Sequence, residues 1–173
     1  MDLAIKKAKN IKLLAMDVDG ILSDGQIIYH SDDTETKAFY VQDGLGLQAL
    51  RRFGLTLAII TGRNSPMVAR RAKELGIEYV IQGRDDKYIA LRDLAENLQL
   101  DLSQCAYMGD DLPDLKAVRE AGLGISVPNG CEQTRAVADF VTQKTGGHGA
   151  VREVCELILQ AQGFFDEFIN QYR

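Results

Sequence analysis

The sequence predicts an α/β fold, a Rossmann-like open parallel sheet with helices on both faces, plus a β-hairpin after the first strand. Short apolar runs alternate along the chain with segments of helical periodicity, a pattern typical of parallel strands joined by crossover helices. Several apolar runs end directly in charged or hydroxyl side chains, as expected where strand ends open onto a site. With 173 residues, the chain is expected to form a single domain over 1–173.

The first strand is expected at 12–16, after a short helix at 2–10. It ends in Asp17 and Asp19, followed by Gly20. In an extended chain these two carboxylates point the same way, roughly 6–7 Å apart. A solvated turn is one interpretation, because Asp and Gly are common in turns. A Mg²⁺ site, and a nucleophile beside an acid–base group, are two others that are compatible with each other.

A hairpin is predicted over about 26–41. Two β-rich runs, Gln26–His30 and Thr36–Val41, flank a polar segment directly after the acidic pair. The sequence is equally consistent with a lid over the site and with an extension of the sheet edge.

A helix is expected over about 43–53, with Asp43 and Gly44 at its start. This region contains a G-x-G-x-x-A string, which could suggest a dinucleotide-binding fingerprint. That fingerprint needs an acidic residue about twenty positions later to hold the ribose, and Thr61 and Arg63 occupy that region instead. We therefore interpret the glycines as a tight turn into a helix that faces the site.

The second buried strand, at 55–60, leads into Thr61, Gly62 and Arg63. A hydroxyl, a flexible backbone and a guanidinium at a strand end can bind an anion. A simple strand-to-helix turn, leading into the helix expected over 66–75, is the other interpretation. Both can hold together.

Three further strands are expected at 78–82, 105–108 and 124–127, with helices over about 88–97 and 113–121. In a parallel sheet, the carboxyl ends of the strands meet at one edge. Residues scattered in the sequence should therefore meet there: Asp17, Asp19, Thr61, Lys87 and Asp110. Such a set suits phosphoryl transfer, which depends on positioning the phosphoryl group and neutralising its charge.

Composition limits the partners and the compartment. The net charge is −5 and no basic run is long enough to track a nucleic-acid backbone, so no nucleic-acid partner is expected. No apolar stretch approaches the roughly twenty residues that cross a bilayer, so no membrane partner is expected. Cys105, Cys131 and Cys155 are odd in number and widely spaced, which fits neither a disulfide framework nor a zinc site. We expect a cytoplasmic protein.

Four groups of residues resemble, in order and spacing, the four motifs of the haloacid dehalogenase superfamily. They are Asp17-Val18-Asp19-Gly20, Thr61-Gly62-Arg63, Lys87, and Gly109-Asp110-Asp111 with Asp114. The resemblance implies a phosphatase with an aspartyl-phosphate intermediate. Asp17 would be the nucleophile, and Asp19 would protonate the leaving oxygen and then activate water.

The same resemblance implies the remaining roles. Thr61 would hold the phosphoryl group, and Lys87 would balance the charge on Asp17. Asp110 would bind Mg²⁺ together with Asp17 and the backbone carbonyl of Asp19. Asp111 and Asp114 are further candidates near the metal.

The chain has room for a hairpin but not for a cap domain, which larger members of the superfamily insert to close the site. It is similar to a capless branch that hydrolyses 3-deoxy-D-manno-octulosonate 8-phosphate in lipopolysaccharide sugar biosynthesis. Members of that branch form homotetramers in which a neighbour's hairpin and a C-terminal tail help to close each site. The tail here, about 163–173, carries aromatics at helical spacing, which could pack on their own domain or on a neighbour.

Substrate binding is expected from residues in the stretches that carry this similarity. They are Gly62, Arg63, Asp43, Gly44, Arg70 and His148. Arg63 could pair with the sugar carboxylate or with phosphate, because arginine suits both. His148 lies between glycines, and a lone histidine is more often structural than a ligand.

Three alternatives remain. A phosphatase for sialic-acid-type 9-phosphates, or an inactive regulatory relative, shares much of the sequence pattern. A phosphoacceptor receiver domain also combines acidic residues, a threonine and a lysine, but here Asp110 and Asp111 follow Lys87 and the chain is longer than a receiver needs. A metal-dependent binding module would bind ligand without releasing phosphate.

Overall fold

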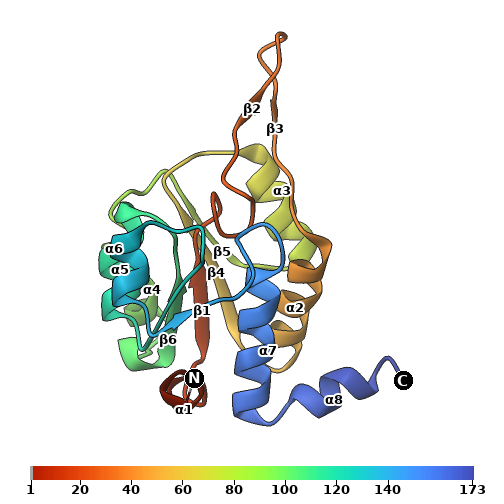
Figure 1. Cartoon of the computed structure of the whole chain (residues 1–173), viewed down its shortest axis with the longest axis vertical. Coiled ribbons are helices and arrows are strands. Elements are labelled where there is room, and N and C mark those ends of the chain that lie inside the picture. The colour runs from red at the N-terminus through yellow and green to blue at the C-terminus, as the bar shows by residue number, and fades with distance from the viewer. Residues whose placement is uncertain (1) are drawn as a thin grey trace.

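The computed structural model describes residues 2–173, and its centre is a six-stranded parallel sheet (Figure 1). The strand order is β5-β4-β1-β6-β7-β8. The strands are β1 (Leu13–Met16), β4 (Thr56–Thr61), β5 (Tyr79–Gln82), β6 (Cys105–Met108), β7 (Leu123–Ser126) and β8 (Phe140–Val141). β1 lies in the middle, with Leu13 opposite Thr56 of β4 and Cys105 of β6.

Helices cover both faces of the sheet, as predicted (Figure 1). One face carries α1 (Asp2–Ala8), α2 (Val41–Arg52), α3 (Pro66–Leu75), α7 (Ala150–Gln162) and α8 (Phe165–Asn170). The other carries α4 (Lys87–Asn97), α5 (Leu115–Glu120) and α6 (Glu132–Val137). Two short 3-10 helices, η1 (Leu102–Gln104) and η2 (Leu112–Asp114), complete the elements.

The central strand explains why its sequence is apolar throughout. Every residue of β1 is buried, and successive side chains alternate between the two layers. Leu14 and Met16 pack in one hydrophobic cluster, while Leu13 and Ala15 pack in the other. A strand covered on both faces therefore needs an unbroken apolar run.

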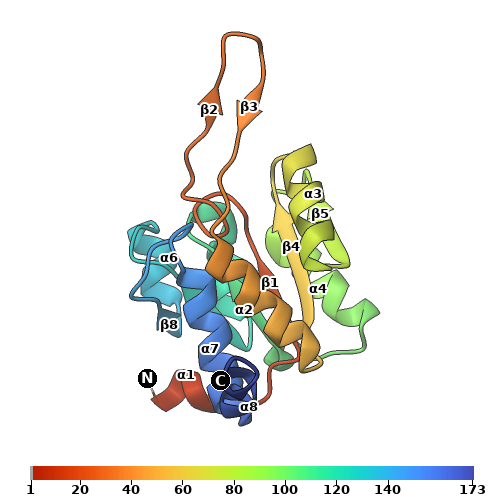
Figure 2. The ribbon, with the colours of Figure 1, turned by 90° about the vertical axis from the view of Figure 1, so that its right-hand side faces the viewer.

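The hairpin consists of β2 (Ile28–Tyr29) and β3 (Glu35–Thr36), which pair antiparallel. It projects from the edge of the sheet where β1 and β4 end (Figure 2). Its paired part is shorter than the two predicted runs, and Val41 begins α2 instead of ending a strand. Within residues 2–173, the insert after β1 is this hairpin and the interval between β5 and β6 holds α4 and η1, in agreement with the predicted absence of a cap domain.

The first and last helices, α1 and α8, lie at the opposite end of the molecule from the hairpin (Figures 1 and 2). The predicted fold class is confirmed. β8 was not predicted, because its two residues are too few to give a periodic signal.

Candidate active site

The strand ends converge on one cavity of about 390 Å³. Asp17 follows β1, Thr61 ends β4, Lys87 begins α4 and Asp110 lies just beyond β6. The residues that line the cavity are Asp17, Asp19, Gly25, Thr61, Gly62, Arg63, Asp85, Lys87, Asp110, Asp111, Pro113 and Asp114. Because these strands are parallel, their carboxyl ends bring all four sequence motifs together.

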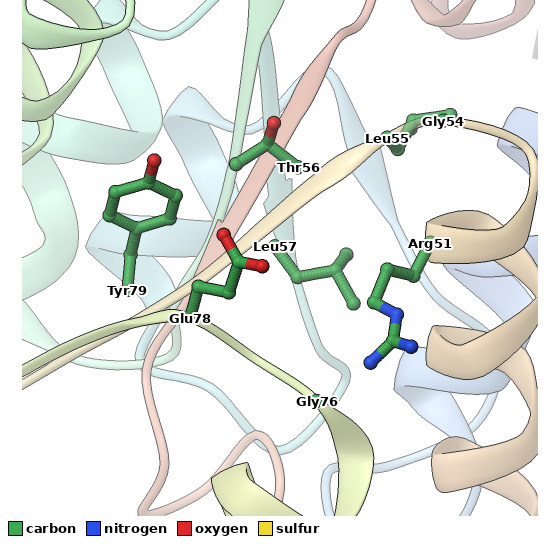
Figure 3. A pocket seen from close by; sticks show the side chains of 8 residues that line it. All are labelled: Arg51, Gly54, Leu55, Thr56, Leu57, Gly76, Glu78 and Tyr79. Atoms are coloured by element: carbon green, nitrogen blue, oxygen red, sulfur yellow. The ribbon is translucent and has the colours of Figure 1, made fainter.

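A second cavity, of about 210 Å³, lies at the amino-terminal ends of β4 and β5 (Figure 3). Arg51 at the end of α2 and residues at the beginnings of β4 and β5 line it. Its lining includes one carboxylate, that of Glu78, and four aliphatic or glycine positions, Gly54, Leu55, Leu57 and Gly76. Because ligands of open parallel sheets bind beyond the carboxyl ends of the strands, the first cavity is the candidate active site.

Lys87 joins two carboxylates in the floor of the active-site cavity. Its Nζ lies 2.6 Å from Asp17 Oδ2 and 2.8 Å from Asp114 Oδ1, and all three residues are buried. Burial alone would lower the pKa of Lys87, but the charges of Asp17 and Asp114 outweigh it and raise that pKa. Lys87 therefore stays charged, as a group that balances a carboxylate must.

Asp114 organises this floor through four hydrogen bonds. Its Oδ1 accepts from Lys87 Nζ and from the Tyr107 hydroxyl, each at 2.8 Å. Its Oδ2 accepts from the backbone N–H groups of Asp110 at 3.1 Å and Asp111 at 3.2 Å. Since both oxygens are occupied, Asp114 fixes the loop after β6 and the position of the lysine.

The acidic cluster fits a divalent cation. Carboxylate oxygens of Asp17, Asp110 and Asp114 lie within 4.8 Å of one another. Burial, followed by repulsion from Asp114, raises the pKa of Asp17 to about 6. Burial, followed by repulsion from Asp114 and Asp17, raises the pKa of Asp110 to about 7. A hard cation such as Mg²⁺ would relieve this repulsion, and oxygen is its preferred ligand atom.

Two glycines allow carboxylates that line the cavity to lie close to the backbone. Gly20 has φ +86°, and a Cβ placed there would lie 2.1 Å from Asp110 Oδ2. A Cβ on Gly62 would lie 2.3 Å from Asp85 Oδ1. Any side chain at either position would therefore displace a carboxylate that lines the cavity.

Asp19 faces a different set of partners from those of Asp17. Its Oδ1 forms an ion pair with Lys37 Nζ and accepts from Ser23 Oγ at 3.3 Å. Its Oδ2 lies 3.7 Å from Arg63 Nε. Arg63 also pairs with Glu35 of β3, with Nη2 2.9 Å from Oε2. The hairpin therefore contributes two charged residues beside the acidic pair.

The structure places the other predicted substrate-binding residues elsewhere. Asp43 and Gly44 lie in α2, where Asp43 Oδ1 accepts from the backbone N–H of Arg152 at 2.8 Å. Arg70 in α3 is exposed and pairs with Glu74. His148 lies in the loop before α7. Their roles in binding stay predictions.

Sequence reasoning missed Lys37 and Asp85. Asp85 lies two residues before Lys87 at the same strand end, so the acidic pair Asp85-Asp86 was an available signal. Lys37 gave no comparable signal, because its contact depends on the direction that the hairpin takes from the sheet.

Comparisons with known proteins place the chain in a family. The profile of the haloacid dehalogenase-like hydrolases matches residues 80–154. The chain is 45% identical over 167 residues to the 3-deoxy-D-manno-octulosonate 8-phosphate phosphatase KdsC of Escherichia coli (strain K12), over 96% of this chain and 89% of that protein. Among residues 2–173, no helix has the length and apolar character to cross a membrane.

Solved structures are similar over nearly the whole chain. One is the 3-deoxy-D-manno-octulosonate 8-phosphate phosphatase of Moraxella catarrhalis in complex with a magnesium ion, a phosphate ion and a KDO molecule. It has 72% identity and a TM-score of 0.99, over 100% of this chain and 99% of that one. Another is the cobalt-bound deoxy-D-mannose-octulosonate 8-phosphate phosphatase of Haemophilus influenzae, with 38% identity and a TM-score of 0.90, over 94% and 95%. The chain therefore belongs to the 3-deoxy-D-manno-octulosonate 8-phosphate phosphatases, within the haloacid dehalogenase-like hydrolases.

Proposed function

We propose that the protein is a Mg²⁺-dependent phosphatase that converts 3-deoxy-D-manno-octulosonate 8-phosphate to the free sugar acid and inorganic phosphate. This reaction serves lipopolysaccharide sugar biosynthesis. The observation that carries the proposal is the convergence of Asp17, Thr61, Lys87 and Asp110 on one cavity. The 72% identity to a relative crystallised with magnesium, phosphate and KDO supports the substrate and the metal.

The first step is phosphoryl transfer to Asp17. A carboxylate oxygen of Asp17 attacks phosphorus, and the bond from phosphorus to the sugar oxygen breaks. Lys87, 2.6 Å from Asp17, offsets the negative charge that gathers around the transferred group. The Thr61 side chain, at the end of β4, is in a position to donate a hydrogen bond to a phosphoryl oxygen.

Asp19 handles the protons in both steps. It gives a proton to the leaving sugar oxygen, then takes one from the water that hydrolyses the aspartyl phosphate. Asp17 and Asp110, with the backbone carbonyl of Asp19, would hold Mg²⁺, while Asp114 and Asp111 keep that loop in place. When bound, the cation neutralises phosphate charge and orients the phosphoryl group.

Arg63 is the group best placed to recognise the sugar acid. Its side chain is 42% exposed, whereas Asp17 and Lys87 in the same cavity are buried. A guanidinium can bind a carboxylate through two parallel hydrogen bonds. We assign it to the carboxylate of the substrate, with the backbone at Gly62 beside it.

Phosphate release tests the function directly. The purified protein is assayed with Mg²⁺ and with EDTA, on 3-deoxy-D-manno-octulosonate 8-phosphate, N-acetylneuraminate 9-phosphate and glucose 6-phosphate. We expect metal-dependent release with strong preference for the octulosonate. Preference for the nine-carbon substrate would overturn the substrate assignment, and no release from any substrate would overturn the enzyme assignment.

Replacing the nucleophile gives a second test. Asp17→Asn is expected to abolish turnover, because an amide cannot attack phosphorus. Its melting temperature should not fall, since the substitution removes a buried charge from the acidic cluster. Turnover is measured by phosphate release, and folding by thermal denaturation. Appreciable activity in a folded Asp17→Asn protein would contradict the assignment.

We further propose that the chain, as one catalytic domain, forms a homotetramer through its hairpins and acts in the cytoplasm. Ile27 and Ile28 are 40% and 45% exposed, and an isolated two-stranded hairpin is marginally stable in water. Packing against hairpins of other subunits would cover these side chains. The three cysteines are free, which suits a reducing compartment.

A further inference from the structure

Lys37 has a buried side chain that the proposed mechanism has not used. It directly follows β3, on the returning strand of the hairpin. Only 1% of its side chain is exposed, and its Nζ forms an ion pair with Asp19 Oδ1. Burying an ammonium group is costly unless a partner compensates it, so this side chain has one strongly preferred position.

The two oxygens of Asp19 have unequal surroundings. Oδ1 is held by Lys37 and by the Ser23 hydroxyl at 3.3 Å. Oδ2 has a looser neighbour, Arg63, at 3.7 Å. One oxygen is therefore anchored, while the other remains available to a group that enters the cavity.

Lys37 reaches Asp19 from outside the active-site cavity. It lines a neighbouring cavity of about 200 Å³ together with Phe39, Met67, Arg70, Arg71 and Glu74. Asp19 lines the active-site cavity itself. The ion pair thus connects the base of the hairpin to the acidic pair, and does not occupy the position of the substrate phosphate.

We propose that Lys37 is a positioning residue, which anchors Asp19 Oδ1 so that Oδ2 faces the leaving oxygen. This inference rests on the proposed function. In the first step the bond between phosphorus and the sugar oxygen breaks as Asp17 bonds to phosphorus, and the proton on Asp19 Oδ2 passes to that oxygen. In the second step water attacks phosphorus, its proton returns to Oδ2, and Asp17 is released with inorganic phosphate.

Leaving-group dependence distinguishes positioning from binding. An alkoxide such as the sugar oxygen needs the proton from Asp19, whereas 4-nitrophenolate leaves without one. Lys37→Met should therefore lower kcat/KM for 3-deoxy-D-manno-octulosonate 8-phosphate about 100-fold, the usual effect of losing general acid catalysis. For 4-nitrophenyl phosphate we expect a change of less than about threefold. The substitution keeps the aliphatic stem and removes the charge.

A matched control and a rescue experiment complete the test. Lys73→Met removes a lysine from the exposed surface of α3, and should leave both substrates unaffected. Lys37→Ala should regain activity toward the octulosonate when ethylammonium is added, because a small amine can enter the cavity that Lys37 lines and fill the space left by its side chain. Lys37→Ala also provides a second variant if Lys37→Met does not fold.

Several results would overturn the inference. Equal losses on both substrates would indicate a general structural effect, and a rise in KM at unchanged kcat would indicate a binding role. Absence of rescue by ethylammonium in a folded Lys37→Ala protein would also reject it. Failure of the wild-type protein to hydrolyse the octulosonate would instead reject the proposed function, so the two failures are distinguishable.

Discussion

The two carboxylates of the acidic pair, Asp17 and Asp19, form ion pairs with different lysines. Asp17 pairs with Lys87 at the start of α4, and Asp19 pairs with Lys37 at the base of the hairpin. Both lysines are largely buried, so both ion pairs are held in place by packing as well as by charge. Two chemically identical side chains thus acquire different surroundings, as different roles in one reaction require.

Gly20 is predicted to be required for full Mg²⁺ affinity. Gly20→Ala would place a Cβ 2.1 Å from Asp110 Oδ2 and displace that carboxylate. We expect Mg²⁺ affinity and turnover to fall about 10- to 100-fold, the usual effect of disturbing the groups around a metal ligand. The measurement is phosphate release across a Mg²⁺ titration.

Gly54→Ala is the control for Gly20→Ala. Gly54 has a similar φ of +89°, but a Cβ there has nothing within 4 Å. Gly54→Ala should lower the free energy of unfolding by about 1–2 kcal/mol, through backbone strain alone. Equal effects of the two substitutions on the Mg²⁺ titration would contradict the steric explanation.

Asp43 is predicted to make stability pH-dependent. Burial raises its pKa to about 6, with partial opposition from the backbone N–H groups of Arg152 and Gly149. The folded state therefore binds more protons than the unfolded state between about pH 4 and pH 6, and stability falls as pH rises through this range. Asp43→Asn should gain on the order of 2 kcal/mol relative to wild type between pH 4.5 and pH 7.

Urea denaturation of both proteins at the two pH values measures this gain. Asp166→Asn, at an exposed site in α8, tests whether any such substitution has the same effect. A constant difference between wild type and Asp43→Asn at both pH values would show that Asp43 does not cause the slope.

For single residues, the sequence predicted the groups at strand ends but not the side chains and backbone groups that they contact. Asp17, Thr61 and Asp110 could be placed together because parallel strands deliver their ends to one edge. The four hydrogen bonds of Asp114 could not be predicted, since they depend on the turn geometry of η2 and on a tyrosine inside β6. The contact between Lys37 and Asp19 could not be predicted either, because it depends on the direction that the hairpin takes from the sheet.

At the scale of elements, the C-terminal segment packs on its own chain. Phe164 stacks on Phe53, which directly follows α2, with ring centroids 4.9 Å apart. Phe168 of α8 is 2% exposed, and the Arg152 guanidinium lies 5.2 Å from its ring centroid. The aromatic spacing of the tail thus matches the interpretation of packing on its own domain.

Phe168→Ala is expected to destabilise the fold by about 3 kcal/mol, because it removes a buried aromatic ring. Turnover per folded molecule should not change, since α8 lies at the end of the molecule away from the hairpin (Figure 2). Urea denaturation and phosphate release measure the two effects. Tyr172→Ala, at a position 64% exposed, should cost less than about 1 kcal/mol. A loss of turnover without loss of stability would favour docking of the tail at a neighbouring site.

Among the strands of the sheet and the hairpin, the longer ones were the easier to predict from the sequence. The strands at 13–16, 56–61, 79–82, 105–108 and 123–126 carry apolar runs that identify them. β2, β3 and β8 have two residues each, and their boundaries are set by pairing partners instead of by local preference.

At the scale of the whole molecule, the hairpin is the feature that extends furthest from the rest of the chain (Figures 1 and 2). If hairpins assemble the proposed homotetramer, light scattering should give a mass of four chains of 19.1 kDa each. Replacing Ile27 and Ile28 together with serine should shift the mass to smaller species, because it removes the exposed apolar surface.

Leu3→Ser is the control for this double substitution, since Leu3 is 60% exposed but lies in α1 at the other end of the molecule. It should leave the mass unchanged. A wild-type protein with the mass of one chain would contradict the assembly, whatever the variants do.

The placement of α1 and α8 opposite the hairpin has a practical consequence for surface chemistry. A bead or sensor chip coupled through either terminal helix would hold the molecule with its strand ends pointing into the bulk solution. Substrate would then diffuse to the cavity unhindered by the support, and the projecting hairpin would remain accessible to soluble subunits. Immobilisation through the termini therefore suits both turnover and assembly measurements.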